Sequence, residues 1–231
     1  MLHEELIQIA EPLLGAVREH PFWTGLADGS LPPAALARFV AQDTDHLLPV
    51  YARALARCAA SAPSNAHAAL LSRSAFASLE ARDRLRLAYG ELTPALRLVA
   101  LPEIAAAEPA TRAHCATFTA ASATSFVVGV GALLPMVWFN HRVSDQLLER
   151  HAPGSRYEPW IQAYHPGPGY THAVRAFLAM VDAVAEEAGP RGRDQIVESF
   201  VAAAEHEPAF ADTAWQARAD SSIPDQERTF V

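Results

Sequence analysis

The sequence has few cysteines, few charged residues and no cluster of basic residues, and each shortage argues against a class of protein. Its two cysteines, Cys58 and Cys115, have a spacing that suggests neither a disulfide framework nor a metal site, and both are expected to be small buried hydrophobes. Charged residues make up 19% of the chain and the net charge is -8, which disfavours nucleic acid or an anionic membrane as a partner.

Signals for export or membrane insertion are also missing. The first stretch, MLHEELIQIAEPLL, carries acidic residues where a signal peptide would carry basic ones. The longest apolar run, 126–139, is too short to cross a bilayer. The sequence therefore predicts a soluble, cytoplasmic protein with no membrane partner.

Hydrophobic residues make up 51% of the 231-residue chain, enough for one substantial core. They recur with helical periodicity and show no convincing alternation with period two. We expect one all-α domain over residues 1–220, of about seven or eight helices, followed by a polar, loosely held tail at 221–231. The expected helices cover 2–18, 33–60, 64–91, 109–121, 124–150, 170–188 and 191–218, with a short helical turn at 156–163.

Two acidic residues of the expected 33–60 helix point in opposite directions. At 100° per residue, Asp43 falls on the apolar face, His46 on its edge and Asp45 on the reverse face. Asp45 is expected to be an ordinary solvated residue. A buried carboxylate at Asp43 requires a partner, a proton or a ligand, because burying an unpaired charge costs several kcal/mol. A structural ion pair and a binding site remain equal alternatives on this helix alone.

The last expected helix, 191–218, carries a second inward acid. Glu207 lies on the apolar face and Glu205 on the reverse face, while Pro208 is expected to kink the helix beside Glu207. A kink next to an inward acid favours a cavity that Glu207 shares with Asp43. The alternative is that the helix ends there and leaves Glu207 in solvent.

The stretch ALLPMVWFNH places Met136 and Asn140 one helical turn apart on one face. The two side chains are positioned to line one cavity. A gap-filling methionine and a hydrogen-bonded core amide explain the same pattern, so this stretch alone has no specificity.

Catalytic and cofactor motifs with known spacings are not present. The sequence has no G-x-S-x-G elbow, phosphate-binding loop or dinucleotide fingerprint. Its nearest approach to the Glu-x-x-His pairs of dinuclear iron proteins is Glu80-Ala-Arg-Asp83, which lacks the histidine. We therefore expect no metal site and no cofactor.

Four segments, in order from about residue 20 to 215, resemble the TenA family of thiaminase II-type enzymes. These segments are HPFWTGLADGSLPPAALARFVAQDTDHL, ALLPMVWF, EPWIQAY and FVAAAEHEPAFADTAW. The resemblance implies a haem-oxygenase-like all-α bundle, assembled as a homo-oligomer (dimer or tetramer). It implies a small-molecule substrate, an aminopyrimidine compound of thiamin salvage or degradation.

Carried over to this sequence, the resemblance assigns roles to three residues. Asp43 would hold the ring nitrogen and exocyclic amine of the pyrimidine, Tyr164 would line the pocket, and Glu207 would act as the acid/base. Asp43 and Glu207 are also the two inward acids that the helix faces indicate.

Three positions depart from the family pattern. Met136 stands where the family has its nucleophilic cysteine, Asn140 where it has an aromatic residue, and His46 where it has a tyrosine. A thioether forms no thiolate, so the covalent route is not expected. We expect a hydrolase, related to a cysteine-lacking branch of the family, in which Glu207 and Asp43 are catalytic. Asp43, His46, Met136, Asn140 and Tyr164 would bind the substrate, and His46 would relay a proton or only donate a hydrogen bond.

Two other classes remain open at this stage. One is a haem-oxygenase-like oxidase, with dinuclear iron or without a cofactor. The other is a non-catalytic small-molecule-binding protein that keeps the pocket.

Overall fold

The computed structural model describes residues 1–98 and 100–220, and these contain helices and no strands. The expected tail at 221–231 lies outside the described residues. The predicted all-α class is therefore confirmed for the part of the chain that is described. The elements are α1 (Leu2–Arg18), α2 (Pro21–Asp28), α3 (Pro33–Gln42), the π-helical turn η1 (Asp43–Leu47), α4 (Leu48–Ala60), α5 (Asn65–Leu96), α6 (Pro109–Thr124), α7 (Phe126–Arg150), α8 (Glu158–Tyr164), α9 (Gly169–Ala204) and α10 (His206–Asp220).

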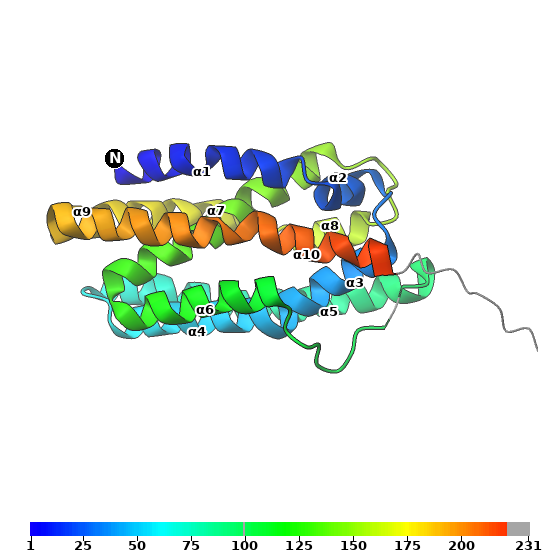
Figure 1. Ribbon diagram of the computed structural model, residues 1–231, viewed down its shortest axis with the longest axis horizontal. Coiled ribbons are helices and arrows are strands. Elements are labelled where there is room, and N and C mark those ends of the chain that lie inside the picture. The colour runs from blue at the N-terminus through cyan, green and yellow to red at the C-terminus, as the bar shows by residue number, and fades with distance from the viewer. Residues whose placement is uncertain (99, 221–231) are drawn as a thin grey trace, which may run out of the picture.

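The helices pack as a bundle around one main hydrophobic core, to which every helix contributes buried side chains, with a small second cluster at Ala121, Ala132 and Ala203. Figure 1 shows α4 with α5 and α6 in the lower part of the bundle, below α7, α9 and α10, and α1 along the top. The closest packing joins α7 to α9 and α4 to α5. The space between these two pairs is where a cavity forms.

The structure contains one helix that the periodicity did not predict, α2. It is only eight residues long, about two turns, so a hydrophobic pattern has little room to repeat. Its ends carry the signals instead: His20 accepts a hydrogen bond from the Phe22 N–H, Pro21 opens the helix, and Gly29 closes it with φ 83°.

The expected 33–60 helix is continuous, but it contains a π-turn at η1. The N–H of Leu48 donates to the carbonyl of Asp43, five residues back instead of four. The π-turn therefore contains one residue more than an α-helical turn. As a result, the side chains after it point in directions that differ from those of an uninterrupted α-helix. Such bulges are frequent at functional sites.

The C-terminal helices are interrupted at two places. Gly189, with φ 68° and ψ -168°, breaks α9 between the two helices that the sequence predicts there. The second interruption is at Glu205, so Pro208 lies in the first turn of α10 and not in the middle of a helix. The kink expected at Pro208 is therefore replaced by a helix break at Glu205. Pro208 itself lies in the first turn of α10, where the missing N–H costs no helical hydrogen bond.

Helix α7 as a whole is long and apolar enough to meet the composition test for a membrane span, although its apolar run 126–139 is not. In its most apolar window, 56% of the residues are buried inside the bundle. The central helix of a packed core meets the same test, and α7 occupies that position between α6 and α9.

Candidate active site

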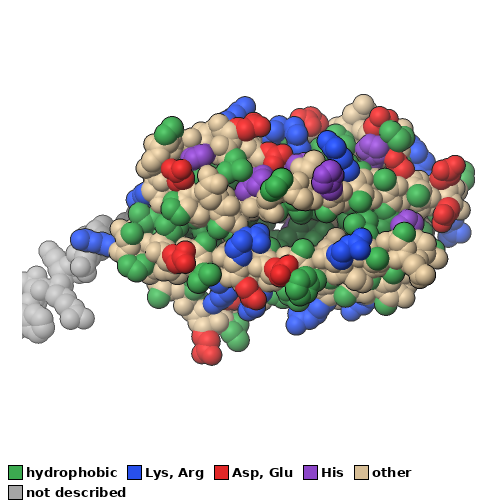
Figure 2. All heavy atoms as spheres, turned by 180° about the vertical axis from the view of Figure 1, so that it is seen from behind, with side chains coloured by type: hydrophobic (Ala, Val, Ile, Leu, Met, Phe, Trp, Pro, Cys, Tyr) green, Lys and Arg blue, Asp and Glu red, His purple; other side chains and the backbone are tan. Residues whose placement is uncertain are grey.

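A cavity of about 620 Å³ lies between η1, α4, α5, α7, α9 and α10. Figure 2 shows a hollow on the face turned away from the viewer in Figure 1, with hydrophobic side chains in its depth. The volume is typical of small-molecule sites. Of the residues expected to form the site, Asp43, Met136, Asn140, Tyr164 and Glu207 all line this cavity.

Asp43 and Glu207 are the acidic groups in the interior of the cavity, and both are largely removed from water. Asp43 is 5% exposed, and its burial raises the pKa of the carboxyl to about 7. The Glu207 side chain is 16% exposed. Burial, and secondly the charge of Asp43, raise the pKa of Glu207 to about 8. At neutral pH the carboxyl groups of Asp43 and Glu207 therefore carry, between them, about one bound proton or more.

No described residue forms a hydrogen bond or an ion pair with the carboxylate of Asp43. The Oε1 atom of Glu207 is buried and also lacks a hydrogen-bond partner. Leaving a buried polar group unpaired costs about 1–3 kcal/mol, and more for a charge. Two such groups on one cavity favour a ligand that supplies the missing donors.

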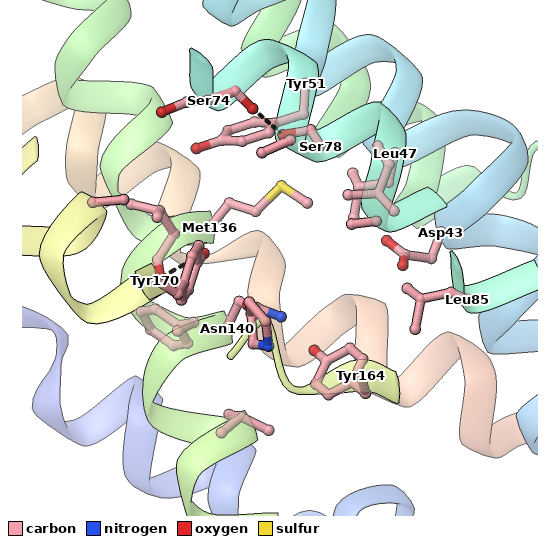
Figure 3. Close-up of a pocket in the computed structure, with 18 of the residues that line it drawn as sticks. Asp43, Leu47, Tyr51, Ser74, Ser78, Leu85, Met136, Asn140, Tyr164 and Tyr170 are labelled. Atoms are coloured by element: carbon pink, nitrogen blue, oxygen red, sulfur yellow. Dashed lines mark hydrogen bonds between the residues drawn. The ribbon is translucent and has the colours of Figure 1, made fainter. Parts of the chain in front are cut away.

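Helix α7 forms one wall of the cavity, and its backbone is anchored by two tyrosines. Tyr51 donates its hydroxyl to the carbonyl of Leu133 at 2.8 Å, and Tyr170 donates to the carbonyl of Val137 at 3.3 Å. Met136, between these carbonyls, points its thioether into the cavity (Figure 3). The apolar stretch of α7 is therefore a cavity wall.

Tyr164 reaches the cavity from α8, and Figure 3 shows its hydroxyl facing Asn140. Its ring stacks on Trp160, with centroids 4.9 Å apart. Burial, and secondly the charge of Asp43, raise the pKa of this phenol well above its usual value. The Tyr164 hydroxyl is therefore a neutral hydrogen-bonding group and not a base.

His46 and Asp45 do not occupy the expected places. The Nε2 of His46 lies 2.7 Å from the carbonyl of Ala105, and His46 is not among the lining residues. The predicted role of His46 in substrate binding has no support here, since the ring turns toward the segment before α6. Asp45 is not solvated: its side chain is 5% exposed, and it accepts hydrogen bonds from Arg86 and from the Ala105 N–H.

Sequence reasoning missed His114, a residue of α6 whose side chain contacts Glu207. It is 1% exposed, and its Nε2 lies 3.9 Å from Glu207 Oε1. Burial, aided by nearby His206, lowers the pKa of His114 to about 3, so the ring is neutral. No sequence motif marks a single histidine in an Ala/Thr-rich helix, because the residue that it contacts, Glu207, is distant in the sequence.

The cysteines and potential metal ligands lie elsewhere. Neither Cys58 nor Cys115 is among the described residues that line the cavity, and burial raises the pKa of each thiol to about 11. Across residues 1–98 and 100–220, no three or more His, Cys, Asp or Glu side chains are grouped so as to hold a metal ion. The chemistry that this cavity offers is proton transfer by two carboxyl groups near neutral pH.

Comparison with known proteins identifies relatives along almost the whole chain. The model of the TENA/THI-4/PQQC family matches residues 7–217. The aminopyrimidine aminohydrolase of Bacillus subtilis is 26% identical over 213 residues, which cover 90% of this chain and 88% of that protein. The thiamine biosynthesis multifunctional protein ThiED of Corynebacterium efficiens is 29% identical over 203 residues, 87% of this chain. The chain spans 26% of the length of ThiED.

Solved structures share the fold at low sequence identity. A TenA homologue from P. horikoshii OT3 superposes with a TM-score of 0.76 at 23% identity, covering 94% of this chain and 99% of that chain. A domain of unknown function with a haem-oxygenase-like fold, from Shewanella denitrificans, gives a TM-score of 0.67 at 13% identity, covering 99% and 97% of the two chains. The expected haem-oxygenase-like bundle is thus confirmed.

Proposed function

The chain belongs to the TENA/THI-4/PQQC family, and we propose that it hydrolyses a C–N bond of an aminopyrimidine compound of thiamin metabolism. In this proposal Glu207 is the acid/base, Asp43 orients the pyrimidine, and no covalent intermediate forms. The observation that carries the proposal is the pair of buried carboxyl groups that face one cavity beside a thioether, neither of them hydrogen-bonded to a described residue.

Glu207 is suited to both halves of a hydrolysis. With its pKa raised to about 8, protonated and ionised forms are both available near neutral pH. The ionised form takes a proton from water as the water oxygen adds to the carbon. The same proton then passes to the nitrogen as the C–N bond breaks. General acid–base help of this kind contributes about 10²–10⁴ in rate.

Asp43 is suited to hold the ring. An aminopyrimidine presents an exocyclic amine and an adjacent ring nitrogen, which, when protonated, form an amidine-like pair of N–H donors. A carboxylate accepts such a pair in two parallel hydrogen bonds. These donors also favour the ionised form of Asp43 and would lower the pKa that burial has raised. Tyr164 and Asn140 complete the polar lining on this side of the cavity.

Met136 restricts the reaction. A thioether cannot attack the pyrimidine, so the cleavage of intact thiamin through a thiolate adduct is excluded at this position. Direct attack of water on an amide is compatible with the two carboxyl groups. We therefore propose a formylaminomethyl-pyrimidine as substrate, giving the aminomethyl-pyrimidine and formate.

We also propose that the protein acts in the cytoplasm as a homo-oligomer. Apolar side chains on the outer face of α5 support an interface, since Phe76 is 64% exposed and Leu87 is 65% exposed. Exposed apolar side chains mark a contact surface when they form one patch, and the proposal requires Phe76 and Leu87 to belong to such a patch.

The test is turnover by purified, metal-stripped protein, followed by mass spectrometry. The substrates are thiamin, an aminomethyl-pyrimidine and its formylated form. Glu207→Gln removes the acid/base, and Glu205→Gln is the matched control, because Glu205 is exposed on the neighbouring turn. We expect turnover of the formylated form that Glu207→Gln abolishes and Glu205→Gln retains. Equal turnover by Glu207→Gln would contradict the proposal.

A further inference from the structure

Helices α6 and α10 bring three titratable side chains together: Glu207, which lines the cavity, and His114 and His206, which do not. The His114 ring lies between Phe118, with centroids 4.5 Å apart, and His206, with centroids 5.0 Å apart. Its Nε2 faces Glu207 Oε1 at 3.9 Å. His114 is not among the residues that line the cavity, so it approaches Glu207 from the protein side.

The polar atoms at this contact have no other partners. Both ring nitrogens of His114 and Oε1 of Glu207 are buried without a hydrogen bond to any described residue. His206, in contrast, is anchored, with its Nε2 2.8 Å from the Thr117 hydroxyl. Each unpaired buried group costs stability, whereas a phenylalanine in place of His114 would fill the space without that cost. A histidine at this position therefore costs stability that a phenylalanine would not.

A neutral imidazole has one donor and one acceptor nitrogen. It can accept the O–H of a protonated carboxyl group or, in the other tautomer, donate an N–H to an ionised one. The 3.9 Å separation is about 1 Å longer than a hydrogen bond. Contacts of catalytic groups are often long in the free protein and shorten when substrate is bound.

We infer that His114 is the positioning residue of Glu207, whose carboxyl group it holds by a hydrogen bond from Nε2 in either protonation state. Its catalytic purpose rests on the proposed function, but the hydrogen bond itself does not. His114 does not touch the substrate and acts through Glu207 alone.

Other titratable groups also face Glu207 and must remain unchanged in a test. Asp43 approaches from η1, Tyr51 from α4, Tyr164 from α8 and Tyr170 from α9. The charge of Glu207 contributes to the raised pKa of each of the three tyrosines, and Asp43 contributes to the raised pKa of Glu207. A change at His114 leaves all four in place.

The test measures the titration of Glu207 directly in the full chain, both without ligand and with a saturating aminomethyl-pyrimidine, because the contact is expected to shorten when the cavity is occupied. Glutamate is labelled with ¹³C at the carboxyl carbon, and the Glu207 signal is assigned by its loss in Glu207→Gln. We expect His114→Phe to raise the titration midpoint of Glu207 by about one pH unit, because the lost N–H bond to the ionised carboxylate is charge-assisted and stronger than the lost bond to the protonated form. His114→Gln, whose amide nitrogen and oxygen can take the place of Nε2, should keep the midpoint within about 0.3 units of the wild type.

The control is His67→Phe. His67 also has an unpaired buried nitrogen and stacks on an aromatic ring, Phe126, but it does not line the cavity. Its replacement should leave the Glu207 midpoint unchanged. If His114→Phe does not fold, His114→Leu carries the same test.

Turnover adds a second readout. His114→Phe should lower kcat about tenfold or more with little change in KM, and His114→Gln should restore most of it. An unchanged Glu207 midpoint in His114→Phe or His114→Leu would overturn the inference. So would a loss of stability with no shift in the midpoint, which is the result for a merely structural histidine. A shifted midpoint in a protein that turns over no pyrimidine would uphold the inference and refute the proposed function.

Discussion

Asp43 and Asp45 stand two residues apart in the same π-turn, and their carboxylates have opposite surroundings. Asp45 accepts hydrogen bonds from Arg86 on α5 and from the backbone N–H of Ala105 at 2.9 Å. Asp43 faces the cavity and has no hydrogen-bond partner among the described residues. Both side chains are buried, so burial alone does not distinguish a structural acid from a functional one. What distinguishes the two acids is whether the carboxylate has a hydrogen-bond partner in the protein.

The same contrast extends to the residues around each acid. On the Asp45 side, the Gln42 amide donates to the Ala106 carbonyl at 2.9 Å and accepts from the Glu108 N–H at 3.0 Å, which ties the segment 101–108 to the bundle. On the Asp43 side, Glu207 and His114 also lack partners. We call the first group the loop clamp and the second the open acid pair with its histidine. Satisfied polar groups help to specify a fold, whereas an unsatisfied one costs stability and, where it faces a cavity, favours a ligand.

The largest expected effect comes from the open acid pair. Glu207→Gln should lower turnover of the formylated pyrimidine by about 10²–10⁴, because the amide neither takes nor gives the proton. The free energy of unfolding should stay equal or rise, since glutamine keeps the shape of the side chain, can still hydrogen-bond His114 and carries no charge into the buried site. Turnover measured by mass spectrometry and urea unfolding of the same samples check both parts. A large loss of stability would mean that Glu207 belongs with the structural acids.

A change in the loop clamp should have the converse effect. Asp45→Ala removes the charged partner of Arg86, which keeps only the Thr44 hydroxyl, and the acceptor of the Ala105 N–H, so it should lower the free energy of unfolding by about 3 kcal/mol. Turnover per folded molecule should change little. Asp83→Ala is the control, because Asp83 pairs with Arg82 but its side chain is 72% exposed, and its loss should cost less than about 1 kcal/mol. Equal losses in the two variants would contradict the structural role of Asp45.

Asp43→Asn should change how stability depends on pH. The pKa of the Asp43 carboxyl group is 3.8 in an exposed chain and about 7 in the folded protein. Between these two values the folded protein keeps the proton that the unfolded chain has already released. The unfolded state therefore binds fewer protons between pH 4 and 7, and Asp43 lowers stability as pH rises through this window. The variant should become more stable than the wild type by a few kcal/mol at pH 8 and match it near pH 4. Urea unfolding at both values measures this, and a constant difference would refute it.

The smallest effect is expected at Met136. Met136→Cys should leave a thiol that is unreactive at pH 7, because burial and the two neighbouring carboxyl groups disfavour a thiolate, as burial does at Cys58 and Cys115. Stability should fall by about 1 kcal/mol through the lost volume. The rate of alkylation by iodoacetamide, compared with that of the wild type, measures the reactivity of the new thiol. Rapid alkylation with cleavage of thiamin would show that this cavity activates a nucleophile.

The sequence predicted most helices because their hydrophobic periodicity is a local property. Helix α1 and the continuous run from α3 to α4 begin and end where they were expected. Helix α2 was missed because eight residues give too short a pattern. The π-turn was missed because a fixed period of 3.6 residues cannot register an inserted residue.

The site was predictable as far as it depends on single helices. Asp43, Met136, Asn140 and Glu207 were placed by the face of the helix that carries them, and all four line the cavity. The surroundings of Asp45, His46 and His114 were not predictable. Their partners, Arg86, Ala105 and Glu207, come from other parts of the chain, and helix periodicity contains no information on such contacts.

The most direct test of this comparison is the stabilisation that a ligand gives to each aspartate variant. The free energy of unfolding is measured with and without a saturating aminomethyl-pyrimidine for the wild type, Asp43→Asn and Asp45→Asn. A ligand that binds only the folded state at about 100 times its Kd stabilises it by about 2.7 kcal/mol. We predict this increment for the wild type and Asp45→Asn and its loss in Asp43→Asn. An equal increment in all three proteins would contradict the claim that Asp43 is left unpaired for a ligand.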